Sequence, residues 1–68
     1  MSMDQQIATL RNALTAIASS IAQTEADLRT ASSADDIRSL TSSLVDLRAE
    51  RSRLQAQLDD LESAQVDG

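Results

Sequence analysis

The chain has 68 residues, of which 6 are Arg and 11 are Asp or Glu, and its net charge at pH 7 is −5. It contains no aromatic residue and no His, Cys, Pro or Lys, and its single Gly is the last residue, Gly68. These absences exclude a Cys or His zinc site, a disulfide framework, a Ser-His-Asp triad and a phosphate-binding glycine loop. We therefore expect one domain (residues 1–68) with no enzymatic activity, no metal ion and no cofactor.

The charge balance also bears on the kind of partner. A net negative chain repels polyanions on average, and without aromatic residues it has no platform on which bases could stack. The longest uncharged stretch, residues 12–24, is too short and too polar to cross a bilayer. Asp4 lies where a secretory signal would be basic. We therefore expect a cytoplasmic chain whose partners are proteins, with no role for nucleic acid or membranes.

Residues 3–31 show an apolar heptad pattern in which the spacing alternates between four and three residues. This spacing predicts a helix with one apolar stripe that packs against another helix. Its members are Met3, Ile7, Leu10, Leu14, Ile17, Ile21, Leu28 and Ala31, with Thr24 in the remaining position.

Four further alanines, Ala13, Ala16, Ala18 and Ala22, broaden the apolar surface of this first helix. A stripe that packs against one helix does not need them, so we expect them to contact a second copy or another protein. The alternative is that they are there because alanine is the best helix former.

The heptad rhythm breaks after residue 31. The next stripe position holds Asp35, and the rhythm resumes at Ile37, two residues late. A two-residue insertion matches neither a stutter nor a stammer, so one continuous supercoil is disfavoured. Ser33 and Asp36 resemble a capping box at the start of a new helix. The sequence thus predicts a helix over about 3–31, a turn at about 32–34 and a second helix over about 35–65.

The second helix carries its own stripe, which is interrupted by Arg51 and ends on Gln65. A polar residue in such a stripe either fixes register and assembly or lies partly exposed in a loosely packed layer. The sequence leaves both interpretations of Arg51 open. The apolar members are Ile37, Leu40, Leu44, Leu47, Leu54, Leu58 and Leu61.

Folding the chain at the break brings the two stripes into register, with paired residue numbers that sum to 68 (Ile7 opposite Leu61, for example). The same register predicts two opposite-charge pairs along one flank, Arg11 with Glu62 and Glu25 with Arg48. The expected fold is an all-α antiparallel two-helix coiled-coil hairpin. Two alternatives remain: a single helix of about 60 residues in a parallel oligomer, and two helices separated by a short β-hairpin.

Two segments also carry a resemblance to a known family. Residues 4–17 (DQQIATLRNALTAI) resemble the first helix of small tailed-phage head–tail joining proteins of the gpW type, and residues 33–40 (SADDIRSL) resemble the start of that family's second helix. The resemblance implies two antiparallel helices around a short β-hairpin, in a ring that joins portal and tail in the virion. Residues 19–32 depart from this pattern, because they lack the glycines and the β-branched alternation of a hairpin.

Two helices form a thin core, and small chains without disulfides or metals usually oligomerise or dock on a partner. The resemblance therefore favours a structural component of a virion, such as a head–tail connector or neck protein. The alternative is a homodimeric four-helix bundle that acts as an adaptor or regulator.

Overall fold

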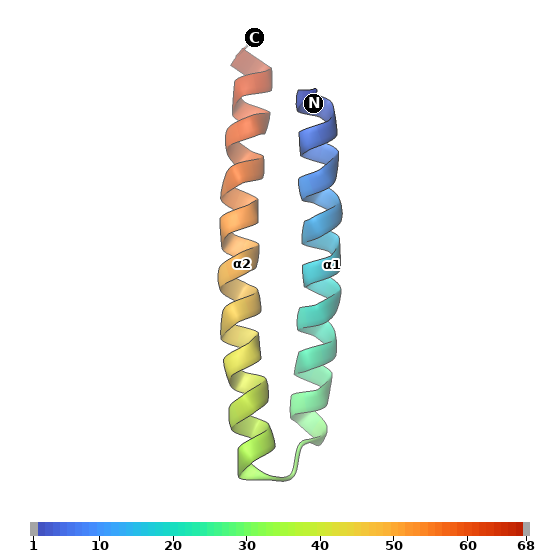
Figure 1. Cartoon of the computed structure of the whole chain (residues 1–68), viewed down its shortest axis with the longest axis vertical. Coiled ribbons are helices and arrows are strands. Elements are labelled where there is room, and N and C mark those ends of the chain that lie inside the picture. The colour runs from blue at the N-terminus through green and yellow to red at the C-terminus, as the bar shows by residue number, and fades with distance from the viewer. Residues whose placement is uncertain (1, 68) are drawn as a thin grey trace.

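The computed structural model describes the backbone of residues 2–67 and the side chains of residues 2–64. Two antiparallel helices, α1 (Met3–Thr30) and α2 (Ala34–Asp67), lie side by side along their length and are joined by a turn over residues 31–33 (Figure 1). The hairpin measures 52 × 16 × 14 Å. The described residues contain no strand, so the fold is the predicted all-α hairpin, and the single long helix and the β-hairpin are both wrong.

The turn lies one residue earlier than the sequence predicts, because Ser33 caps α2. The Ser33 hydroxyl accepts a hydrogen bond from the backbone N–H of Asp36 at 3.0 Å, and the Ser33 carbonyl accepts one from Ile37 at 3.0 Å. The capped helix therefore begins at Ala34, and the carboxylates of Asp35 and Asp36 lie at the positive end of its dipole.

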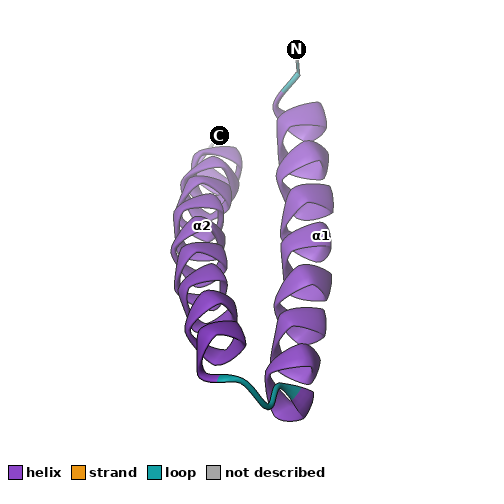
Figure 2. Cartoon of the chain, turned by 60° about the horizontal axis from the view of Figure 1, so that its bottom comes forward, coloured by secondary structure: helices purple, strands orange, loops and turns teal. Residues whose placement is uncertain are grey.

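The first helix ends without a glycine, because the chain leaves it in an extended conformation. Ala31 has φ −69° and ψ 135°, and no described residue has a positive φ. The Ala31 N–H donates to the Leu28 carbonyl at 3.3 Å, and the Thr30 hydroxyl donates to the Asp27 carbonyl at 3.1 Å. These bonds occupy two of the carbonyls that a helix end leaves unpaired. Figure 2 shows the short connection that results.

A second cap lies at the start of α1. The Ser2 hydroxyl accepts from the Gln5 backbone N–H at 3.2 Å, while the Gln5 side-chain oxygen accepts from the Ser2 N–H at 3.3 Å. This reciprocal pair is a capping box, and it is not among the features that the sequence analysis singled out.

The core is a single row of side chains between the helices. Among the described side chains only Ile7, Ile21, Leu44 and Leu58 are buried, each with 5–6% of its surface exposed, and none is below 2%. Most other stripe positions are half-buried, while Met3 and Ile37 are exposed. Thr24 fits this row because its hydroxyl donates to the Ser20 carbonyl at 2.8 Å. The half-buried members are Leu10, Leu14, Ile17, Thr24, Leu28, Ala31, Leu40, Leu47, Leu54 and Leu61.

Candidate interaction surface

The row between the helices has two edges that differ in composition. In heptad notation the stripe consists of a and d positions; the e positions lie beside the a positions, and the g positions lie beside the d positions. In an antiparallel pair the a and e residues of both helices therefore share one edge, and the d and g residues share the other. The a positions are Ile7, Leu14, Ile21, Leu28, Ile37, Leu44, Arg51 and Leu58.

Two interhelical ion pairs span the a/e edge, which we call the bridged edge. Arg11 Nη2 lies 2.6 Å from Glu62 Oε2, and Arg48 Nη2 lies 3.2 Å from Glu25 Oε2. Both pairs were predicted from the sequence, and both are confirmed. The Arg side chains are 62% and 54% exposed, so each pair contributes only about 0–1 kcal/mol to stability.

The ion pairs lie directly beside the buried residues. Arg11 follows Ile7 by four residues on α1, and Glu62 follows Leu58 by four on α2, so all four share one end of the bridged edge. The hydrocarbon part of an Arg side chain shields apolar neighbours from water while its charged end stays exposed.

The second ion pair repeats this arrangement nearer the turn. Glu25 follows Ile21 by four residues, and Arg48 follows Leu44 by four. All four buried residues of the hairpin therefore lie at a positions of the bridged edge, beside one of the two ion pairs.

The opposite edge, formed by the d and g residues, is open. No described d residue is buried, and no ion pair joins the two helices here among the residues whose side chains are described. On α1 the g residues near its middle are Ala13 and Ser20, which are too short to cover the apolar residues beside them. On α2 the g residue at this level is Glu50, whose carboxylate pairs with Arg53 within the helix. We call this surface the open edge. Its d residues beyond Met3 are Leu10, Ile17, Thr24, Ala31, Leu40, Leu47, Leu54 and Leu61.

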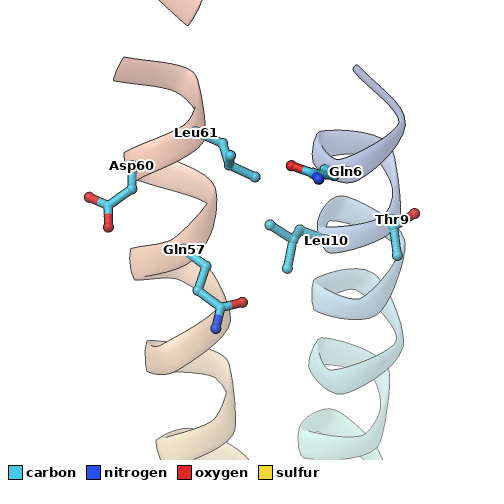
Figure 3. Close-up of a pocket in the computed structure, with 6 residues that line it drawn as sticks. All are labelled: Gln6, Thr9, Leu10, Gln57, Asp60 and Leu61. Carbon is cyan, nitrogen blue, oxygen red and sulfur yellow. The ribbon is translucent and has the colours of Figure 1, made fainter. Parts of the chain in front are cut away.

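A groove of about 490 Å³ lies on the bridged edge beside Leu28 and Leu44, and one of about 440 Å³ lies on the open edge near the free ends of the helices. Leu10 and Leu61, both d residues, extend toward each other from α1 and α2 (Figure 3). The remaining lining residues are Gln6, Thr9, Gln57 and Asp60. Leu10 and Leu61 make this groove largely apolar, and Asp60 is its one charged lining residue. Such a groove suits an apolar protein side chain better than a polar small molecule.

The four alanines that the sequence analysis grouped as one interface do not share one surface. Ala13 (g) and Ala16 (c) lie on the side of the open edge, while Ala18 (e) and Ala22 (b) lie on the side of the bridged edge. Ala13 is half-buried, and the other three are exposed. Although all four broaden the apolar surface of α1, they form two pairs on opposite sides of the seam.

Arg51 is exposed, although it occupies an a position, and it has no ion-pair partner among the described side chains. It lies between the two ion pairs along the bridged edge, at the level of Ile17 on α1. The e residues that face each other between the two ion pairs are Ala18 and Gln55, which carry no charge. The third ion pair, Arg53 with Glu50 at 3.0 Å, lies within α2 and does not join the helices.

The part of the chain that the structure describes holds neither a metal site nor a membrane-spanning helix. No three acidic side chains there are grouped so that they could hold a metal ion. Neither helix, within that same part of the chain, has the length and hydropathy needed to cross a bilayer. Comparison with protein families, with curated proteins and with solved structures finds no match to this chain.

Proposed function

We propose that this chain is a non-enzymatic structural component that works by packing its open edge against a protein within a larger assembly. The observation that carries the proposal is the asymmetry of the seam. Two ion pairs lie beside the four buried residues of the bridged edge, whereas along the open edge every described d residue remains half-buried or exposed. An elongated apolar surface of this kind is typical of a protein–protein contact.

The exposed area supports the same proposal. The hairpin exposes 4838 Å², whereas a compact protein of 7.3 kDa exposes about 4,200 Å². The difference, roughly 600 Å², reflects the elongated shape of the hairpin, 52 × 16 × 14 Å, in which two helices alone bury little surface. A partner packed along the hairpin would supply burial that the chain lacks alone.

Within this class we propose a virion connector or neck component. The support is the resemblance of residues 4–17 and 33–40 to head–tail joining proteins of the gpW type, together with antiparallel helices that contain both segments. The chain differs from that family where residues 19–30 continue α1 and residues 31–33 form a turn in place of a β-hairpin.

A homodimeric four-helix-bundle adaptor is the second candidate. It is favoured because the open edge runs along both helices on the same side of the hairpin. In a four-helix bundle each helix buries a third heptad position besides a and d, and the short g residues Ala13, Ser20 and Ser43 fit that role.

The stability of the isolated hairpin tests the general proposal. Urea unfolding of the full chain, followed by circular dichroism at the lowest usable concentration, should give a free energy of unfolding below about 3–5 kcal/mol, since two helices alone bury little. Native mass spectrometry then separates the candidates: a ring of several copies supports the connector, and a closed pair supports the adaptor. A monomer that is fully stable at every concentration would contradict both.

A further inference from the structure

We infer that a second copy of this chain covers the open edge, with α1 of one copy packed antiparallel against α1 of the other. The inference rests on the second candidate function, the homodimeric bundle, and names the helix through which the two copies meet. In such a contact a two-fold axis brings the same surface of both copies together. The surface must therefore carry little net charge, because it would otherwise meet a surface of the same charge, and its shape must fit a copy of itself.

The α1 side of the open edge meets the charge requirement. Its g and c residues carry no charge from Gln6 to Gln23, although each copy has a net charge of −5. Two copies can therefore approach along α1 without bringing like charges together. These g and c residues are Gln6, Thr9, Ala13, Ala16, Ser20 and Gln23.

The α2 side of the open edge does not meet it. Asp36, Asp46 and Asp60 lie there at g and c positions, and the nearby Glu50 is already paired with Arg53 at 3.0 Å. Like charges placed across a contact between copies repel each other. The acidic α2 side would suit a basic partner, whereas the uncharged α1 side suits a second copy.

Side-chain size separates the two helices in the same way. Near the middle of α1 the open edge presents Ala13, Ala16 and Ser20, which allow a second helix to approach closely. The corresponding part of α2 presents the longer side chains Glu50 and Arg53. The close contact between copies therefore runs along α1.

The open side of α1 also supplies an apolar centre for this contact. Leu10 and Ile17, both d residues, are half-buried in the hairpin and would be covered by a second copy.

A matched pair of variants tests the inference. Ala16→Glu places a charge on the open side of α1, and Ala22→Glu places the same charge at the mirror-image position on the bridged side; both alanines are exposed. Sedimentation equilibrium of the full chain should show a dimer that Ala16→Glu weakens at least about tenfold and that Ala22→Glu changes less than about twofold. Equal losses, or a greater loss with Ala22→Glu, would overturn the inference.

Cysteine crosslinking gives an independent measurement if the glutamate variant fails to fold. The chain has no Cys, so Ala16→Cys and Ala22→Cys each introduce a single thiol. With oxidised glutathione as oxidant, Ala16→Cys should form a disulfide-linked dimer at least about tenfold faster than Ala22→Cys, because effective concentration is far higher across a specific contact. Equal rates would overturn the inference.

Failure of the inference can be told apart from failure of the proposed function. If the chain has low stability and stays monomeric at millimolar concentration, the inference that a second copy covers the open edge is overturned, and the proposed function still stands. If such a monomer binds a polyarginine peptide and loses that binding with Asp46→Asn, the open edge binds a basic partner instead of a second copy. A fully stable monomer overturns both.

Discussion

Arg11 of α1 and Glu62 of α2 meet at 2.6 Å across the bridged edge, and each follows a buried residue of its own helix by four positions. The residues beneath them, Ile7 and Leu58, are two of the four buried side chains in the hairpin. This arrangement couples register to burial, because a shift of one helix along the other would separate the charges and expose the apolar pair together.

The register can be tested by reversing this ion pair. Arg11→Glu brings two carboxylates together and should lower the free energy of unfolding, and adding Glu62→Arg should recover about 0.5–1 kcal/mol of that loss. Urea unfolding at a fixed protein concentration measures both steps. Reversal of Glu50 and Arg53 is the control, since that pair lies within α2 and does not report on the interhelical register. No recovery in the double variant would contradict the assigned register.

Burial along α2 predicts the cost of truncating its side chains. Leu44 is 5% exposed, whereas the adjacent Val45 is 60% exposed. Leu44→Ala should lower the free energy of unfolding by about 2–5 kcal/mol, and Val45→Ala should change it by less than about 0.5 kcal/mol. Thermal unfolding followed by circular dichroism measures both. Equal effects at the two positions would show that Leu44 does not face α1.

The turn depends on one side-chain hydrogen bond. Ser33→Ala removes the acceptor for the Asp36 N–H and should cost about 1 kcal/mol of stability. The adjacent Ser32 makes no such bond, so Ser32→Ala is the matched control and should be nearly silent. If both substitutions have the same effect in urea unfolding, Ser33 is not the cap of α2.

Arg51 interrupts the apolar stripe and is exposed without an ion-pair partner among the described side chains. We expect Arg51→Leu to raise the free energy of unfolding by about 1 kcal/mol, because a leucine there can pack at the level of Ile17. Arg38→Leu, which changes an exposed Arg outside the stripe, is the control and should have little effect. A loss of stability with Arg51→Leu, or a change in the number of copies, would show instead that Arg51 specifies register or assembly.

The heptad spacing was sufficient to predict the fold, the register and both interhelical ion pairs, because in two long helices these features follow from the helical repeat. The place of the turn was off by one residue, since the Ser33 cap and the extended Ala31 act within a single turn of helix. Helix ends depend on such local hydrogen bonds, which a periodic pattern does not report.

The difference between the two edges was not predicted. The a and d positions are both apolar in sequence, and which of them is covered depends on the length of the e and g side chains beside them. The signal was present: Arg11 and Arg48 are long e residues, whereas Ala13 and Ser20 are short g residues. The heptad positions of the four alanines, g, c, e and b, also carry the information that they flank the seam on both sides. The structure divides them into two pairs, on opposite sides of the seam.

Small-angle X-ray scattering of the purified full chain, at concentrations from micromolar to millimolar, tests the central claim most directly, because it gives mass and length together. If a second copy covers the open edge side by side, the mass should reach twice 7.3 kDa while the longest dimension stays near 52 Å. A mass of one chain at every concentration, or a doubled mass with a doubled length, would contradict the claim that the open edge is where two copies meet.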